Sequence, residues 1–215
     1  MPKSPFEFLN EHILVSHETF ERFQLYYELL LKWHDKINLI GKDTLSDIWN
    51  RHFLDSLQLA KYIDDTNKTI VDLGTGAGFP GMTLAIYGYK NVHLVESDSR
   101  KAVFLKEVSR VTGTEVFIRN SRIENFILDE VDVIISRACS PLDELLQLSE
   151  KIISRETICL FHKGKNYSIE HENAQKDWQY DMAVTPSIAG FQSFILKLSN
   201  VRKVRYHGQS RREQI

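Results

Sequence analysis

A short segment that joins a β-branched run to four closely spaced glycines constrains this chain more than any other. Residues 70–73 have the composition of a buried strand. Residues 74–81 contain four glycines and a proline, which predict a tight turn that leads into a helix. Because glycine has no Cβ, a ligand can contact the backbone of such a turn, and the first helical turn offers N–H groups without intrahelical partners. The segment therefore predicts a ligand site of the strand–turn–helix kind.

Two binding patterns fit this turn. Gly76, Gly78 and Gly81 fit the G-x-G-x-x-G pattern of dinucleotide-binding enzymes. Asp72 followed by Gly74 and the next two glycines fits the Asp-x-Gly-x-Gly-x-Gly pattern of S-adenosylmethionine (AdoMet) methyltransferases. A carboxylate at the strand tip repels a pyrophosphate but suits a ligand that carries an ammonium and a sulfonium. Charge therefore favours AdoMet, and a turn without a ligand in an ordinary α/β sheet is the structural alternative.

The rest of the chain predicts an α/β fold of the Rossmann-like AdoMet-dependent methyltransferase type. Apolar periodicity indicates strands that alternate with helices, which is typical of a doubly wound and mostly parallel sheet. The strands are expected at 70–73, 91–96, 115–119, 131–135 and 157–161, and the helices at 82–88, 98–112, 141–152 and 167–176. Two last strands, 178–184 and 192–198, have no helix between them and should form an antiparallel hairpin. Such a hairpin favours AdoMet over a dinucleotide a second time.

The N-terminal third predicts helices. From the N-cap Ser16, apolar residues recur at helical spacing and predict a helix that packs on the core, namely Phe20, Phe23, Tyr27, Leu30 and Trp33. A second helix is expected over 46–63, with His52, Asp55 and Ser56 on one face, where they either bond one another or line a site. We therefore divide the chain into an N-terminal helical cap (1–66), an AdoMet-binding core (67–199) and a basic C-terminal tail (200–215).

The amino-acid composition limits which partners the protein can bind and predicts its cellular compartment. The 215 residues carry 27 Lys and Arg against 29 Asp and Glu, a net charge of −2, which excludes a strongly basic histone-type binder but leaves RNA open as a substrate. No apolar run approaches the ~20 residues of a membrane span, and no signal-peptide core is present. The two cysteines, Cys139 and Cys159, offer no metal-ligand or disulfide framework. We expect a cytoplasmic protein that binds neither membrane nor metal.

The carboxyl ends of the predicted strands supply candidate cofactor ligands, because ligands of open α/β sheets bind at that edge. Asp72 would face the amino-acid end of AdoMet, and Glu96 would accept hydrogen bonds from its ribose hydroxyls. After the third strand, the Ile123 backbone N–H is placed to bond the adenine ring and the Glu124 carboxylate to bond its amine.

Two cations, Arg137 and Lys163, follow the fourth and fifth strands. Singly, each is more often a salt-bridged surface residue, but together at one cleft they suit a phosphate-bearing substrate. Residues 136–139, Ser-Arg-Ala-Cys, replace the Asn/Asp-Pro-Pro-aromatic loop used to methylate exocyclic amines, and Cys139 lacks the adjacent proline usual for carbon-five methylation. Methylation of a ring nitrogen such as guanine N7 needs neither that loop nor a cysteine nucleophile, because the nitrogen lone pair is already nucleophilic.

Six groups of residues follow one another in a characteristic order, namely 38–39, 51–52 with 55–56, 72–81, 121–122 with 124, 135–138 and 163–164. This set resembles the bacterial 16S ribosomal RNA (guanine-N7)-methyltransferase family, also called glucose-inhibited division protein B, from about residue 20 to residue 198. The resemblance implies methylation of one guanine in a decoding-region hairpin loop of 16S ribosomal RNA in the small subunit. By the family pattern, the AdoMet contacts fall on Gly74, Phe79, Ile123, Glu124 and Arg137.

The resemblance also ranks the remaining candidates. It adds His52 and Asp55 to Arg137 and Lys163 as residues that position the reactants, and no catalytic residue is certain. The RNA contacts are expected at four cations: Arg137, Lys163, Arg122 and Arg51. The family usually has aspartate where this chain has Glu96, and the tail has no family counterpart. We expect a monomer. The alternatives are an AdoMet-dependent methyltransferase that acts on another RNA or a small molecule, and a non-catalytic RNA-binding factor on the same fold.

Overall fold

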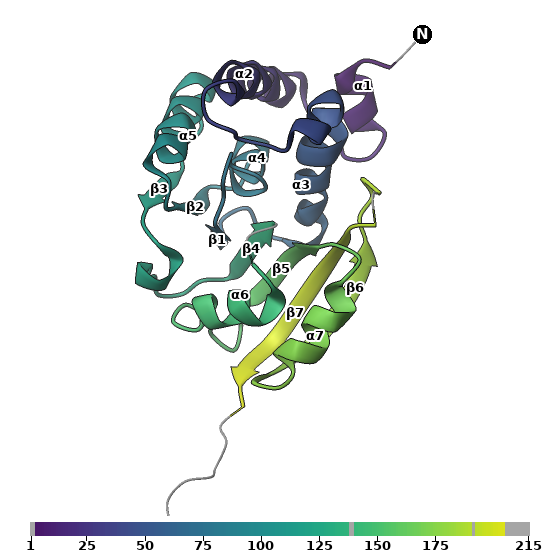
Figure 1. Ribbon diagram of the computed structural model, residues 1–215. Helices are drawn as coiled ribbons and strands as arrows, with labels where there is room; N and C mark the ends of the chain where they lie inside the picture. Colours follow the sequence, from purple (N-terminus) through teal and green to yellow (C-terminus); the bar gives the residue numbers. More distant parts are fainter. Residues whose placement is uncertain (1–2, 138–139, 191, 205–215) are drawn as a thin grey trace, which may run out of the picture.

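The computed structural model describes residues 3–137, 140–190 and 192–204, and in these ranges it contains one seven-stranded sheet with helices on both faces (Figure 1). The strands are β1 (Thr69–Leu73), β2 (Asn91–Glu96), β3 (Phe117–Asn120), β4 (Val133–Arg137), β5 (Ile158–Lys163), β6 (Trp178–Pro186) and β7 (Phe194–Lys203). Their order across the sheet is β3-β2-β1-β4-β5-β7-β6. The first five strands are parallel, and β7 lies antiparallel between β5 and β6. The predicted parallel sheet with its antiparallel hairpin is confirmed.

The helices form two layers around this sheet. The regular helices are α1 (Pro5–Asn10), α2 (His17–His34), α3 (Asp55–Leu57), α4 (Gly81–Tyr87), α5 (Ser99–Thr112), α6 (Leu142–Ser149) and α7 (Tyr167–Ala174). In one layer, α2 packs on α4 and α5, and α3 packs on α4. In the other layer, α6 and α7 pack together near β5 and β7 (Figure 1). Because parallel strands begin at one edge and end at the other, both layers leave the carboxyl ends of β1, β4 and β5 at a common edge.

The N-terminal helices confirm one prediction and add an element. α2 begins after Ser16, whose side chain accepts a hydrogen bond from the Thr19 N–H, as the sequence predicts. The buried residue between Phe23 and Leu30 is Tyr26 rather than Tyr27, which is only half-buried. α1 was not predicted, although Ser4 and its neighbours form a capping box with proline in the first turn, which is a recognisable start signal.

The expected second helix at 46–63 is instead an irregular run from Lys42 to Tyr62. It consists of η1 (Lys42–Asp47, 3₁₀), η2 (Trp49–Leu54, π), α3 and η3 (Gln58–Tyr62, 3₁₀). Helical spacing in a sequence cannot distinguish these forms, because all three place residues three to five apart on one face. A π turn is a common device at functional sites, and here η2 carries Arg51 and His52 to the edge where the strands end.

The C-terminal boundary also differs from the prediction. β7 continues to Lys203 and pairs with β6 up to its end, where Lys203 lies opposite Trp178. Residues 200–203, which the sequence placed in a basic tail, are therefore part of the sheet. Residues 205–215, with the remaining tail cations, lie outside the described residues. The N-terminal cap and the core share one apolar cluster in which Phe23 and Phe53 pack with Phe79.

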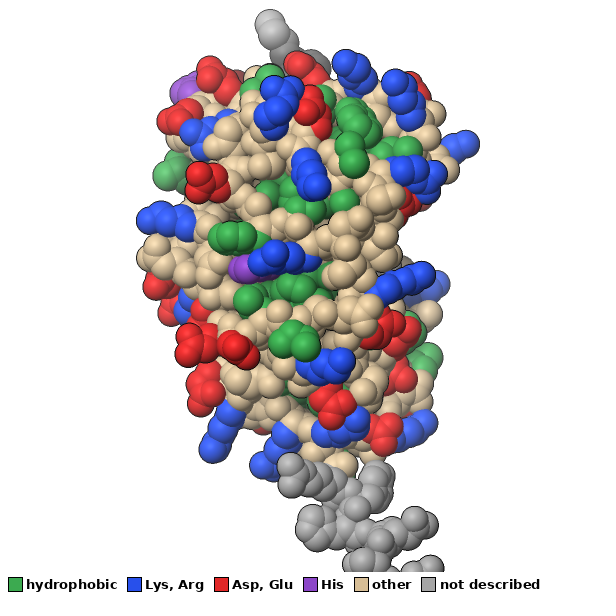
Figure 2. All heavy atoms as spheres, turned by 90° about the vertical axis from the view of Figure 1, so that its left-hand side faces the viewer, with side chains coloured by type: hydrophobic (Ala, Val, Ile, Leu, Met, Phe, Trp, Pro, Cys, Tyr) green, Lys and Arg blue, Asp and Glu red, His purple; other side chains and the backbone are tan. Residues whose placement is uncertain are grey.

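The face of the molecule over α5 and β3 shows how charge is distributed. In Figure 2, Lys and Arg side chains are interspersed with Asp and Glu side chains and gather into no single basic stripe on that face. On α5, Arg100 pairs with Asp98, and Arg110 pairs with Glu107. These cations therefore form the solvated face expected of an ordinary surface helix.

Candidate functional site

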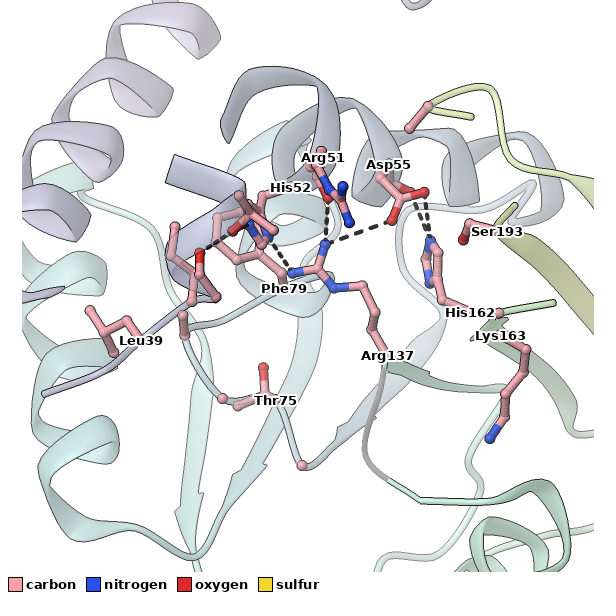
Figure 3. A pocket seen from close by; sticks show the side chains of 18 of the residues that line it. Leu39, Arg51, His52, Asp55, Thr75, Phe79, Arg137, His162, Lys163 and Ser193 are labelled. Carbon is pink, nitrogen blue, oxygen red and sulfur yellow. Dashed lines mark hydrogen bonds and ion pairs between the residues drawn. The ribbon is translucent and has the colours of Figure 1, made fainter. Parts of the chain in front are cut away.

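A cavity of about 790 Å³ lies at the carboxyl ends of β1, β4 and β5. Its walls come from the glycine-rich turn after β1, the N-terminal cap, the segments after β4 and β5, and the loop between β6 and β7. They include Leu39, Gly41, Thr44, Arg51, His52, Asp55, Gly74, Thr75, Gly76, Phe79, Lys101, Arg137, Ser140, Pro141, His162, Lys163, Glu170, Ala189 and Ser193. The volume suits a small-molecule ligand with room to spare for a base. Figure 3 shows Thr75 and Phe79 on one side of Arg137, and Lys163 on the other.

The glycines of the turn divide into two kinds. Gly74 and Gly76 have positive φ angles of 65° and 59° and line the cavity. A Cβ on Gly76 would meet no atom nearer than 3.9 Å, so bare backbone faces open space. Gly78 serves packing, because its Cβ would lie 2.6 Å from the Tyr26 hydroxyl and 2.9 Å from Leu105. Gly74 and Gly76 therefore form a cradle for a ligand. The missing Cβ of Gly78 leaves room for the Tyr26 side chain, so that α2 can pack closely on the turn.

Asp72 lies beneath the turn and does not line the cavity. Its Oδ2 accepts hydrogen bonds from the Thr75 hydroxyl at 2.6 Å and from the Gly81 N–H at 2.8 Å. The side chain is fully buried, and burial raises its pKa to about 6. In this position the carboxyl group holds the turn and the start of α4 together. The predicted contact with the amino-acid end of AdoMet stays a prediction.

Glu96 braces the same turn from β2. One carboxylate oxygen accepts the Gly76 N–H at 2.9 Å, and the other accepts the Asp98 N–H at 2.7 Å. A carboxylate has about four lone-pair positions, so two are left for ribose hydroxyls. Ile123 is half-buried in η4 (Ile123–Asn125), where Glu124 and the preceding Arg122 are exposed. These three residues and Glu96 lie outside the cavity lining, and their contacts with adenine, ribose or RNA stay predictions.

Arg137 is the centre of the cavity's polar contacts, here called the Arg137 network (Figure 3). Its guanidinium donates to the Arg51 carbonyl at 2.9 Å and to His52 Nδ1 at 2.7 Å, and lies 3.7 Å from Asp55 Oδ2. It also lies over the Phe79 ring, 5.1 Å from the centroid. Burial lowers the pKa of Arg137, but a guanidinium stays charged in proteins. Arg137 therefore ties the cap to the core.

His52 is a neutral member of this network, and its tautomer follows from its partners. The Thr44 hydroxyl donates to the Gly41 carbonyl at 2.7 Å, so it accepts from His52 Nε2–H at 2.9 Å. The other ring nitrogen, Nδ1, then accepts from Arg137. Burial, followed by the charges of Arg137 and Arg51, lowers the pKa of His52 to about 3. With both nitrogens engaged, His52 orients Arg137 and offers no free base.

Asp55 joins this network to the loop after β6. Its Oδ1 accepts from Gln58 Nε2 and from the Ser187 hydroxyl, each at 2.7 Å. His162 Nε2 donates to the Asp55 carbonyl at 2.8 Å. Ser56, its neighbour, is fully buried and does not line the cavity. Sequence reasoning missed Ser187 and His162, because nothing local marks polar residues whose partner lies more than 100 positions away. It also missed Gln58, although its partner Asp55 lies only three positions before it.

Lys163 has a different set of partners. Its ammonium pairs with Glu170 Oε2 at 2.8 Å and donates to the Ser140 carbonyl. The same carboxylate oxygen accepts the Leu142 N–H at 3.0 Å, at the start of α6. The two predicted cations thus line one cavity, but both have partners inside the protein. Glu170 was not predicted, and no motif in the sequence marks it.

Tyr26 supports the turn from α2. Its hydroxyl donates to the Ala77 carbonyl, and its ring stacks on Phe79 with centroids 5.1 Å apart. Burial raises the pKa of this phenol, which stays protonated. Tyr26 is therefore a second link, beside Arg137, between the cap and the ligand cradle.

Two absences concern residues 3–137, 140–190 and 192–204. No group of three or more His, Cys, Asp or Glu side chains is placed to hold a metal ion. None of the helices in the same ranges has the length and apolarity needed to cross a bilayer. Cys159 is a free, buried thiol, whereas Cys139 lies outside the described residues.

Residues 19–198 match the family described as rRNA small subunit methyltransferase G (GidB). The chain is 46% identical over 191 residues to "Ribosomal RNA small subunit methyltransferase G" of Paramagnetospirillum magneticum, covering 89% of this chain and 93% of the relative. It is 42% identical over 187 residues to the protein of that name from Rhodospirillum centenum, covering 87% of each.

Solved structures share the fold at low identity. A SAM dependent methyltransferase from Aquifex aeolicus has a TM-score of 0.56 and 17% identity, covering 73% of this chain and 95% of that one. A mutant of MtNAS in complex with S-adenosylmethionine has a TM-score of 0.55 and 17% identity, covering 90% of this chain and 83% of that one. At this identity the likeness shows the fold alone.

Proposed function

This chain belongs to the rRNA small subunit methyltransferase G family, and from that premise we propose that it transfers a methyl group from AdoMet to N7 of one guanine in 16S ribosomal RNA. AdoMet is the methyl donor, and the reaction is ribosomal RNA methylation. The observation that carries the proposal is the cavity at the strand ends, where the open glycine cradle faces Arg137 and Lys163.

The cavity fits AdoMet on the side of the glycine-rich turn. Gly74 and Gly76 offer bare backbone, and Leu39 and Phe79 offer apolar surface for a nucleoside. Glu96 has lone pairs left for the ribose after it has bonded the turn. When bound there, AdoMet supplies an electrophilic methyl group on a positively charged sulfur. The residues around it hold this group against the base and exclude water.

The polar groups of the Arg137 network favour a ring nitrogen as the methyl acceptor. The bond that forms joins the lone pair of guanine N7 to the methyl carbon, and the bond that breaks joins that carbon to sulfur, which keeps the electron pair. No proton leaves the base, so no general base is required. His52 has both nitrogens engaged, and Asp55 accepts from Gln58 and Ser187 while facing Arg137. The network thus positions reactants rather than moving protons.

The finer assignments of partner and compartment belong to the same proposal. The substrate is 16S ribosomal RNA or the small ribosomal subunit, and its hairpin loop enters the side of the cavity formed by Lys163 and the β6–β7 loop. Arg51, on the cavity wall, and the exposed Arg122 contact its phosphates. The protein acts as a monomer in the cytoplasm, where its RNA substrate is.

Methyl transfer from labelled AdoMet tests the proposal directly. Small subunits and naked 16S RNA that lack the modification are incubated with the protein, and the modified nucleotide is mapped by cleavage at N7-methylguanine. We expect label at a single guanine. Transfer to a different RNA or to a small molecule would reassign the substrate, and AdoMet binding without any transfer would favour a non-catalytic RNA-binding factor.

A further inference from the structure

The Lys163–Glu170 pair holds hydrogen-bonding capacity that its internal contacts do not use. The Lys163 ammonium has three N–H donors, of which Glu170 and the Ser140 carbonyl take two. Glu170 receives Lys163 and the Leu142 N–H on Oε2 alone. Its Oε1 accepts no hydrogen bond from the described residues. Among the described residues, one Lys163 N–H and Glu170 Oε1 therefore have no internal partner.

Both unused groups belong to residues that line the cavity. Lys163 ends β5 and Glu170 lies on α7, and the Lys163 side chain is 6% exposed against 25% for Glu170. In Figure 3, Lys163 lies across Arg137 from Thr75 and Phe79, hence opposite the glycine cradle. Asp55 is the other carboxylate among the described lining residues, and it is committed to Gln58, Ser187 and Arg137. The wall that a base would meet opposite the cradle thus includes both Lys163 and Glu170.

This arrangement complements the Watson–Crick edge of guanine. That edge presents O6 as an acceptor beside the N1–H and N2–H₂ donors, so an ammonium next to a carboxylate matches it in sequence. Adenine presents the reverse, an N6–H₂ donor beside the N1 acceptor, and would face donor with donor and acceptor with acceptor. With the Watson–Crick edge on this wall, the imidazole side of guanine, which carries N7, points back toward the cradle.

We infer that Lys163 and Glu170 form the specificity-determining pair that selects guanine in this cavity, with Lys163 donating to O6 and Glu170 Oε1 accepting from N1–H and N2–H₂. The inference rests on the proposed function and adds to it the residues that choose the base. Internal contacts pre-organise the pair, since Ser140 and Leu142 fix both side chains before the RNA arrives.

Inosine at the target position, combined with Glu170→Gln, tests the pair. Inosine keeps O6, N1–H and N7 but lacks the N2 amine. Inosine therefore loses only the hydrogen bond that the N2 amine donates to Glu170. With the wild-type protein, we expect inosine to lower kcat/KM roughly 10-fold relative to guanine. In E170Q, the Leu142 N–H and Lys163 should hold the amide oxygen, which turns an N–H₂ group toward the base. We expect E170Q to lower kcat/KM for guanine roughly 10- to 100-fold and to treat inosine and guanine about alike, because the acceptor for the N2 amine is lost.

Controls separate recognition from folding. The matched variant is Glu172→Gln, an exposed carboxylate on the same helix, which should keep the wild-type rate and the full inosine effect. AdoMet binding by calorimetry reports whether E170Q keeps its fold. If it does not, Glu170→Asp carries the same comparison, since it keeps the charge beside Lys163 while withdrawing the oxygen by one methylene.

The possible results distinguish a failure of this inference from a failure of the proposed function. An inosine effect that is absent in the wild type, or that persists undiminished in E170Q or E170D, would overturn the inference while methylation of the guanine RNA upheld the proposed function. A wild-type protein that binds AdoMet but leaves the guanine RNA unmethylated would overturn the proposed function, and this inference with it.

Discussion

Arg137 and Lys163 sit at the ends of neighbouring strands and line the same cavity, yet the protein uses them differently. Arg137 is surrounded by partners from the N-terminal cap, and its contacts with Arg51, His52 and Asp55 hold two parts of the chain together. Among the described residues, Lys163 has two partners, which leaves one N–H, and Glu170 Oε1 accepts no hydrogen bond. A cation at a strand end can thus be a structural tie or a ligand contact, and the location of its partners distinguishes the two: those of Arg137 lie on the N-terminal cap, whereas Lys163 pairs with Glu170 on the cavity wall.

The largest effect is expected from removing the tie. Arg137→Met keeps an apolar side chain over Phe79 but leaves Asp55 buried without its cation, which should lower the free energy of unfolding by about 3–5 kcal/mol. Methyl transfer should fall by about 100-fold, because the cap then no longer aligns the cavity. Urea unfolding and transfer assays measure both. Arg155→Met, at an exposed position, should change neither. A stable R137M protein would contradict the structural role of Arg137.

The next effect depends on pH and tests the neutral state of His52. Its folded pKa of about 3 lies below the unfolded value near 6.5, so the unfolded chain binds a proton first as pH falls. The stability that His52 contributes is present above pH 6.5 and is lost toward pH 3, by about 1.4 kcal/mol per pH unit. At pH 4.5 the wild type should therefore have lost about 2.7 kcal/mol more than His52→Gln, whose amide can bond both Arg137 and Thr44.

The comparison isolates His52 from other titrating groups. Asp72 changes stability with pH in the opposite direction to His52. Its folded pKa of about 6 lies above the usual 3.8, so protonation of Asp72 favours folding as pH falls. His93 and His162, whose pKa values are also lowered by burial, have the same sign as His52. All three are present in both proteins and cancel in the difference. His12→Gln, at an exposed histidine, should leave the wild-type pH dependence unchanged, and equal slopes for wild type and H52Q would contradict a neutral His52.

A smaller effect is expected at the other tie between the cap and the cradle. Tyr26→Phe keeps the ring on Phe79 but leaves the Ala77 carbonyl without its buried donor, which should lower the free energy of unfolding by about 1–2 kcal/mol. AdoMet affinity should fall as well, because Ala77 belongs to the turn. Tyr27→Phe is the matched control on the same helix. Calorimetry that finds equal AdoMet affinity in Y26F and Y27F would contradict a role for Tyr26 in shaping the cradle.

The sequence predicted the parts of this fold that depend on local pattern. The strand–turn–helix at 70–87, the alternation of strands and helices, and the final hairpin all follow from periodicity and glycine placement, which are properties of neighbouring residues. The predicted stripe includes Tyr27, which packs partly buried against the core, but it left out the neighbouring Tyr26, which is fully buried. Adjacent positions differ by only 100° on a helix, so a stripe of apolar residues does not say which of two tyrosines is buried.

The candidate site was only partly predictable, because its residues bond across the fold. Strand ends brought Arg137 and Lys163 to one cavity, as expected, since parallel strands end at one edge. Their partners could not be read from the sequence. Ser187 bonds Asp55 across 132 positions, and Glu170 meets Lys163 only because α7 turns back on β5. Asp72 and Glu96 accept backbone N–H groups of the turn, and their predicted contacts with AdoMet stay predictions.

The smallest effect on stability should come from Lys163, and it sharpens the contrast with Arg137. Lys163→Met leaves Glu170 with the Leu142 N–H and partial exposure to water, so the free energy of unfolding should fall by only about 1 kcal/mol. AdoMet affinity should be unchanged, whereas kcat/KM for RNA should fall roughly 10-fold if Lys163 donates to O6. Lys165→Met, at the exposed neighbour two positions on, is the control. A K163M protein that unfolds as readily as R137M, or that methylates RNA normally, would show that the two cations do not differ in this way.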